Sequence, residues 1–134
     1  MSDIKFKVLE HTHYKVLHAE IFGEIPPGSF GNELTLSFAD KIMSEISTQP
    51  GTIKWLILDF SEANYIYGDC LGVFWVRPRM KDVFSVVIAK GDTGKAIQSL
   101  IEITGFPIPL VEDLNEALDI VSGKNTDNRN EGNK

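Results

Sequence analysis

One apolar run, WLILDF at residues 55–60, constrains the fold of this 134-residue chain more than any other stretch. It has the length of a strand but lacks the alternation of polar and apolar residues that a solvent-exposed face produces. The run therefore predicts a strand that is covered on both faces, inside a sheet with helices packed on it.

The segments around this run predict alternating strands and helices. Residues 4–9 alternate like a half-buried strand, and Leu17, Ala19 and Ile21 mark a second strand that ends near GEIPPG. Apolar residues at helical spacing predict helices at about 30–47 and 69–76, with Pro78 kinking or ending the second. SVVIA (85–89) and PIPLVE (107–112) are expected strands, the latter at a sheet edge, and each precedes a helix.

The last two helices have recognisable ends in the sequence. Gly105 suits the left-handed position after the first of them, and Asp113 with Glu116 resembles a capping box for the second. We predict a single α/β domain over residues 1–123, with a mixed β-sheet of about four to five strands and about four helices. Residues 124–134 contain no apolar side chain and are predicted to be a disordered tail.

Composition excludes several classes of function. The formal charge of −6 disfavours binding to nucleic acids or to anionic membranes, which depends on clustered Lys and Arg. No apolar run reaches the ~18 residues of a membrane span, and the N-terminus lacks the apolar centre of a signal peptide. We therefore expect a cytoplasmic protein. A single cysteine, Cys70, rules out an internal disulfide and a multi-cysteine metal site.

The stretch YIYGDCLG (65–72) lies between a predicted strand and a predicted helix, where functional sites are common. Cys70 near a helix N-terminus is either a nucleophile or, as we favour, a small buried side chain, since no histidine is near in sequence. Asp59, at the expected end of the central strand, either takes part in chemistry or caps the next turn through an Asx-type bond. We favour the cap.

A second candidate site is AKGDTGK (89–95), whose backbone could hold an anion or ligand at Gly91 and Thr93, beside Asp59. Ala89 and Ala96 break the P-loop pattern, so Thr93 is better explained as a helix cap. The three histidines, His11, His13 and His18, are expected to be exposed, because no further ligands complete a metal site. We therefore predict no metal.

The helix after residue 69 has more large apolar residues than one face can bury. Either one of them, such as Trp75, is exposed beside Arg77, Arg79 and Lys81 and anchors a partner, or the whole helix is buried. The sequence leaves both alternatives open.

Residues 56–77, LILDFSEANYIYGDCLGVFWVR, resemble the central segment of STAS domains, the family of bacterial anti-sigma-factor antagonists. SLIEITGF (99–106), DLNEALDIV (113–121) and FGEI (22–25) resemble three further motifs of that family, in the same order. In the ungapped register Asp59 matches the Asp that ends the family's strand, and Leu71-Gly72 matches its Leu-Gly. The turn itself departs from the family: Tyr67 stands at the second Asp, Gly68 at the phosphorylated Ser, Asp69 at the next Ser and Cys70 at the Gly.

The resemblance implies a non-enzymatic module, without a cofactor, that binds a kinase-fold anti-sigma factor as a monomer or weak dimer. The binding residues would be Tyr67, Gly68, Asp69, Cys70, Leu71 and Trp75. Gly68 has no hydroxyl, so the usual phosphorylation switch cannot operate there; a gapped register instead places Cys70 on the Ser and Asp69 on the Asp. The alternatives are a STAS-like subunit of a lipid- or anion-transport complex and a small-ligand or nucleotide-binding protein.

Overall fold

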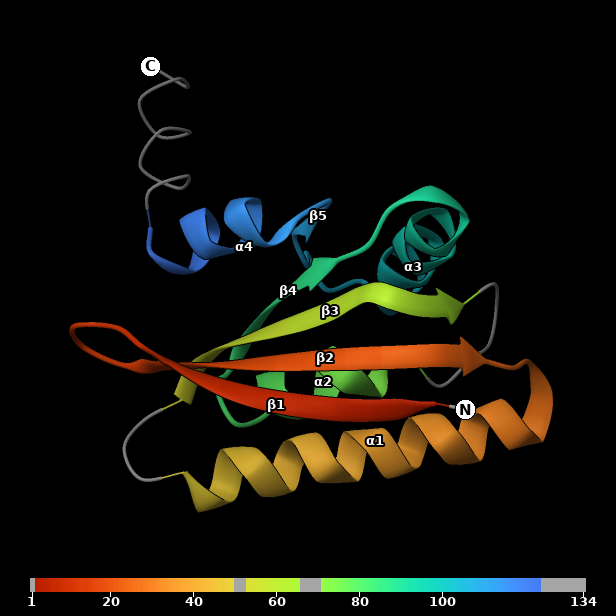
Figure 1. The fold of residues 1–134 in the computed structure, drawn as a ribbon, viewed down its shortest axis with the longest axis horizontal. Helices are drawn as coiled ribbons and strands as arrows, with labels where there is room; N and C mark the ends of the chain where they lie inside the picture. Colours follow the sequence, from red (N-terminus) through yellow and green to blue (C-terminus); the bar gives the residue numbers. More distant parts are fainter. Residues whose placement is uncertain (1, 50–52, 66–70, 124–134) are drawn as a thin grey trace.

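The computed structural model describes residues 2–49, 53–65 and 71–123. Strands and helices follow one another in the predicted α/β pattern (Figure 1). In chain order they are β1 (Asp3–Glu10), β2 (Lys15–Ile25), α1 (Gly28–Thr48), β3 (Ile53–Tyr65), α2 (Val73–Arg79), β4 (Phe84–Ile88), α3 (Gly91–Thr104), β5 (Leu110–Val111) and α4 (Leu114–Val121). No helix in these described segments is long and apolar enough to cross a membrane.

The five strands form one mixed sheet in the order β1-β2-β3-β4-β5. β1 and β2 are an antiparallel hairpin, and each later pair is parallel. Parallel neighbours need crossover connections, which α1, α2 and α3 supply. The prediction for residues 55–60 is confirmed, because β3 lies in the middle of the sheet and Leu56, Ile57 and Leu58 are completely buried.

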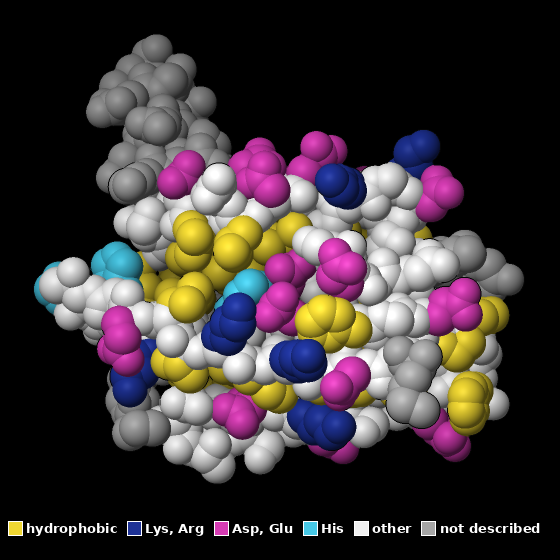
Figure 2. Space-filling view, in the orientation of Figure 1, with side chains coloured by type: hydrophobic (Ala, Val, Ile, Leu, Met, Phe, Trp, Pro, Cys, Tyr) yellow, Lys and Arg dark blue, Asp and Glu magenta, His cyan; other side chains and the backbone are white. Residues whose placement is uncertain are grey.

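Helices cover both faces of the sheet, but unequally. Buried residues of α1, α2 and α3 form one core with Leu56 and Leu58 of β3. On the opposite face, α4 is the one described helix that packs on the sheet, in a smaller core around Ile57. Figure 2 shows this second face: apolar side chains gather beside α4, and charged side chains of both signs are scattered over the strands.

β3 continues beyond the predicted end at Asp59, to Tyr65. Residues 62–65 pair with residues 22–25 of β2, although several of their side chains are exposed. Backbone pairing with β2 therefore extends the strand where the side chains give no apolar signal. One consequence is that Asp59 lies inside a strand, and the prediction that it ends the strand is wrong.

α2 begins at Val73, later than the predicted start; residues 69 and 70 lie outside the described part of the chain. The helix ends one residue after Pro78, in agreement with the expected effect of proline. The predicted left-handed Gly105 is confirmed by its φ of 79°, and the predicted capping box by the hydrogen bond that Glu116 N donates to Asp113 Oδ1 (2.9 Å). The predicted tail, 124–134, lies outside the described residues.

Candidate functional site

The predicted partner-binding turn follows the carboxyl end of β3, where Tyr65 pairs with Ile25 of β2. Tyr67, Gly68, Asp69 and Cys70 lie outside the described residues. The residues on either side of the turn are described, and both are buried: Tyr65 is 2% exposed and Leu71 is 1% exposed. The side chains immediately before and after the turn are therefore both part of the main core.

Thr93 fixes the position of Tyr65, the last residue of β3 before the turn. Its Oγ1 accepts a hydrogen bond from the Tyr65 N–H (3.2 Å), so the end of β3 is tied to the first turn of α3. The cap residue of α3 is Lys90, which makes no side-chain capping bond, and the prediction that Thr93 caps this helix is wrong. A sequence cannot show this role, because it depends on two segments that meet only in the folded protein.

Trp75 is completely buried, as are Leu71 and Phe74. Its indole Nε1 donates to Thr104 Oγ1 at the end of α3 (3.2 Å), whereas Phe74 stacks on Phe60 of β3. These two neighbouring side chains pack against different elements, Trp75 against α3 and Phe74 against β3, so one short helix can bury both. An exposed Trp75 as a binding anchor is therefore excluded, and the alternative of a well-buried helix is confirmed.

Gly72 and Thr104 explain why two of the STAS-like motifs occur together. A Cβ atom at Gly72 would lie 2.9 Å from Thr104 Cγ2, closer than Cβ contacts normally allow. The Leu-Gly motif at the start of α2 and the Thr-Gly motif at the end of α3 are thus in direct contact. Glycine at position 72 allows the beginning of α2, immediately after the turn, to lie against α3.

Asp59 forms a buried polar cluster with residues that sequence reasoning did not connect to it. Asp59 Oδ1 accepts hydrogen bonds from Ser61 N (2.9 Å) and Ser61 Oγ (2.5 Å), so the predicted Asx-type bond is confirmed. Asp59 Oδ2 lies 2.9 Å from His18 Nε2. An ionised carboxylate can only accept, so Nε2 carries the proton and donates.

His18 is only 4% exposed, so the prediction that it is exposed is wrong. His13 is exposed, and His11 is half-buried and stacks on Tyr14 with ring centroids 4.2 Å apart. The sequence could have linked His18 to Asp59 only through the register of β2 on β3, in which Glu20 pairs with Asp59. That register places His18 and Asp59 on the same face of neighbouring strands.

The pKa of Asp59 reflects two opposing effects. Burial by itself raises the pKa of the carboxyl group, but the hydrogen bonds from His18 and Ser61 outweigh it and lower the pKa below its usual value. The carboxylate is therefore ionised at neutral pH and fully engaged by its hydrogen-bond donors.

The cluster does not have the arrangement of a nucleophilic triad. In such a triad the histidine lies between the serine and the acid, and removes the serine proton. Here Asp59 lies between Ser61 and His18, so His18 bonds to the carboxylate and not to the Ser61 hydroxyl. His18, Glu20 and Asp59 offer donor atoms within 4.8 Å of one another, the one such group among the described residues, but hydrogen bonds already satisfy the Asp59 carboxylate.

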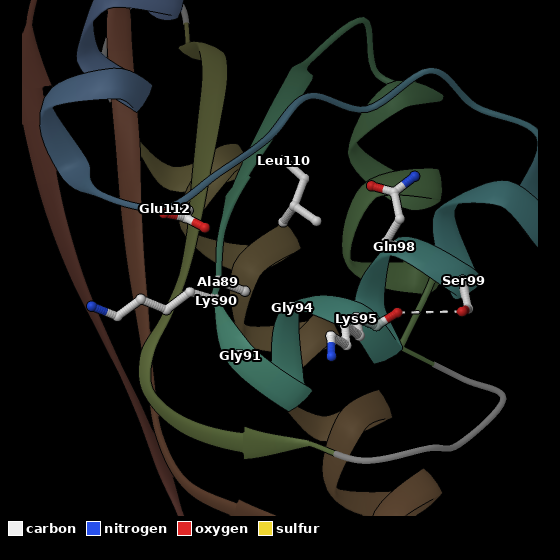
Figure 3. A pocket seen from close by; sticks show the side chains of 9 residues that line it. All are labelled: Ala89, Lys90, Gly91, Gly94, Lys95, Gln98, Ser99, Leu110 and Glu112. Atoms are coloured by element: carbon white, nitrogen blue, oxygen red, sulfur yellow. Dashed lines mark hydrogen bonds between the residues drawn. The ribbon is translucent and has the colours of Figure 1, made fainter.

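Gly91, the other predicted anion contact, lines an open cavity of about 540 Å³ between the start of α3 and the segment around Leu110. Its φ of 65° explains the glycine at the strand-to-helix turn. Lys90, Lys95 and Glu112 also line the cavity. Figure 3 shows that the two lysine side chains extend in different directions, so their ammonium groups do not converge on one anion. Asp59 is not among the lining residues.

The sheet order, the three crossover helices on one face and α4 on the other define the STAS-like fold that the sequence motifs predict. The unphosphorylated form of the anti-sigma factor antagonist SpoIIAA shares it, with a TM-score of 0.57 and 19% identity over 89% of this chain and 97% of that chain. An anti-sigma factor antagonist from Mycobacterium paratuberculosis gives a TM-score of 0.52 and 18% identity over 89% of this chain and 94% of that one. No family model and no curated protein matches the sequence. At these identities the likeness establishes the fold.

Proposed function

We propose that this protein is a non-enzymatic, cytoplasmic binding module that engages a kinase-fold anti-sigma factor as a monomer or weak dimer. The observation that carries the proposal is the match of fold to SpoIIAA, an anti-sigma factor antagonist, over 89% of the chain. The binding surface is the carboxyl edge of the parallel strands, with Tyr67, Gly68, Asp69 and Cys70 in contact with the partner.

The packing around the turn supports this surface. Tyr65 is tied to Thr93, Leu71 is buried in the core, and Gly72 lies against Thr104. A segment whose flanks are fixed before binding loses less conformational entropy in the complex. In this proposal Leu71 and Trp75 position the turn from inside the protein, and the partner contacts the exposed residues.

Phe30 supplies an apolar contact at the same edge. It lies in the first turn of α1, just after the end of β2, and its side chain is 76% exposed. Figure 2 shows apolar side chains at this end of the molecule. An exposed aromatic side chain at this edge of the sheet is a typical interface anchor, so we include Phe30 in the binding surface.

Gly68 and Asp69 define how this module differs from a phosphorylated one. Glycine cannot accept a phosphoryl group, so binding is independent of phosphorylation at this position. Because position 68 cannot take up the phosphate charge that breaks such a complex, the complex is expected to persist under conditions in which a phosphorylated antagonist releases its partner. In this proposal Asp69, just before α2, contributes a constant negative charge to the interface.

Binding of a purified kinase-fold anti-sigma factor from the same organism, measured by calorimetry, tests the proposal. We expect Asp69→Lys and Phe30→Ala to weaken binding by roughly tenfold or more, as for interface anchors. Asp119→Lys on α4 and Leu36→Ala further along α1 are the matched controls, since both residues are exposed and lie outside the first turn of α1 and the 65–72 segment. Unchanged affinity in both Asp69→Lys and Phe30→Ala would refute this placement of the interface.

Mass spectrometry after incubation with the partner and ATP tests the second part. The wild-type protein should gain no phosphate within residues 65–72, and Gly68→Ser should become phosphorylated. Phosphate on Tyr65 or Tyr67 of the wild type would contradict the proposal.

The 540 Å³ cavity favours small-ligand binding as a second candidate function. Nucleotide titration monitored by amide NMR shifts at Gly91 and Gly94 tests it, with Lys95→Gln as the variant. Purification from cells with bound transporter subunits, and without an anti-sigma factor, would instead support the role in a lipid- or anion-transport complex.

A further inference from the structure

A second, smaller cavity lies at the amino ends of β3 and β4, away from the turn. Its volume is about 250 Å³, and it is more enclosed than the cavity at Gly91. The aromatic side chains of Trp55, Trp75, Phe84 and Phe106 line it, together with the loop of residues 106–109. Pockets for drug-sized ligands usually span roughly 300–1,000 Å³, so this cavity suits a molecule built on one ring.

Two polar residues, Ser85 and Arg79, also line this cavity and indicate that it is a binding site. Ser85 is 3% exposed, and its Oγ has no hydrogen-bond partner within the described part of the chain. A buried hydroxyl without a partner destabilises a fold, and such a group often marks a binding position. Ser85 lines the cavity, so a polar group on a ligand in the cavity would give this hydroxyl a partner.

Arg79 provides a positive charge at the mouth of the cavity. Its guanidinium lies 4.5 Å from the centre of the Phe84 ring, and Phe84 is 43% exposed. Within residues 2–49, 53–65 and 71–123, Arg79 has no carboxylate partner, whereas Arg77 on the same helix pairs with Asp40 (2.7 Å). A guanidinium held over an aromatic ring and free of a carboxylate is well placed to receive one.

The edge of β4 keeps the cavity open. Val87 N and Ala89 N donate to Pro109 O and Val111 O across this edge. Because backbone donors alternate in direction along a strand, the Ser85 N–H points to the same side, where β5 does not reach. The short β5 therefore leaves the beginning of β4 bordered by side chains of the 106–109 loop instead of a paired strand.

We propose that this cavity binds a single-ring aromatic carboxylate that also carries a ring hydroxyl. The ring lies between the aromatic walls, the carboxylate pairs with Arg79, and the ring hydroxyl bonds with Ser85. This inference is independent of partner binding at the turn, because it uses a different end of the sheet.

The chain contains two tryptophans, and both line this cavity. The two indole N–H signals in a ¹H–¹⁵N NMR spectrum are therefore local probes, which Trp55→Phe assigns. Titration with 4-hydroxyphenylacetate should shift both signals saturably, with a Kd of roughly 0.1–1 mM for a ligand of this size. The neutral 4-hydroxybenzyl alcohol should bind roughly tenfold more weakly, because it lacks the charge.

Arg79→Gln should weaken binding of the acid by roughly tenfold, and the matched variant Arg77→Gln should leave it within about twofold. Ser85→Ala should weaken the binding of 4-hydroxyphenylacetate but leave the affinity for phenylacetate unchanged. The proposal is overturned if the indole signals do not respond, if the alcohol binds as well as the acid, or if Arg79→Gln and Arg77→Gln behave alike. Equal effects of Ser85→Ala on both acids would remove Ser85 from the site.

Discussion

The ionisation of the Asp59 carboxylate is coupled to the stability of the fold. Its pKa is lower in the folded protein than in the unfolded chain, where an aspartate titrates near ~3.9. A lowered pKa stabilises the fold above the unfolded-state value, and this contribution disappears as the pH falls through the folded-state value. Asp59 therefore stabilises the protein at neutral pH and loses this effect below about pH 4.

Asp59→Asn is expected to lower the free energy of unfolding by about 1–3 kcal/mol near neutral pH, because the charge-assisted bonds from His18 and Ser61 are lost or weakened. The variant should also depend less on pH in the acid range. Urea unfolding at about pH 7 and about pH 3 measures both effects. Asp40→Asn is the control: its surface pair with Arg77 contributes only about 0–1 kcal/mol. An acid dependence of Asp59→Asn equal to that of the wild type would contradict this assignment.

Gly72→Ala tests the contact between the two STAS-like motifs. The added methyl group would overlap Thr104 Cγ2, so the free energy of unfolding should fall by about 1–3 kcal/mol, as in other overpacked cores. Thr104→Ser removes that methyl group but keeps the hydroxyl that accepts from Trp75. The double variant Gly72→Ala/Thr104→Ser should therefore be more stable than expected from the sum of the single changes. If thermal unfolding showed that the stability losses of the two single variants simply add in the double variant, the Gly72–Thr104 contact would not explain the loss in Gly72→Ala.

Individual residues differed in how far the sequence could place them. Gly105 was predictable because its left-handed conformation follows from local chain geometry. Trp75 and His18 were not, because their burial depends on Thr104 and Asp59, which are distant in sequence. Local spacing shows that a side chain is apolar or titratable, but only the register and the crossing of elements decide what it touches.

Among the elements, α4 has the most clearly defined start. Asp113 Oδ1 accepts from Glu116 N, and Glu116 Oε1 accepts from Glu112 N (3.0 Å). Asp113→Ala should lower the free energy of unfolding by about 0.5–2 kcal/mol, the usual value of an N-cap. Asp119→Ala, exposed on the same helix, should change it by less than about 0.5 kcal/mol. Denaturant unfolding compares the two, and equal losses would mean that the cap has no specific effect.

Strand lengths show the limit of reading elements from side-chain patterns. The central part of β3 was predictable from its apolar run, but its continuation to Tyr65 is held by backbone bonds to β2. In β5, by contrast, six residues were expected to form a strand and only Leu110 and Val111 do so. The prolines around it explain the difference, since each removes a backbone donor from the ladder.

For the whole molecule, the order of elements and four weak motifs were sufficient to predict the fold. Helical crossovers between parallel strands leave few possible topologies, and the motifs selected one of them. The site was less predictable. The sequence located the turn. Only the structure shows how the residues on either side of the turn are fixed, through contacts with Thr93 and Thr104 and the burial of Leu71.

The sheet order also predicts how stability is distributed over the molecule. Residues 56–58 of β3 are buried on both faces and paired with both neighbouring strands, so their amides are expected to exchange only when the whole domain unfolds. β5 is short and lies at the edge, and α4 is a single eight-residue helix on the less covered face. Hydrogen exchange at Ile57 and Leu58 should therefore match the free energy of global unfolding measured with urea, whereas amides of β5 and α4 should exchange faster by local opening. If β5 or α4 were protected as strongly as β3, the two faces of the sheet would unfold as one unit, and the smaller core under α4 would contribute more than its area indicates.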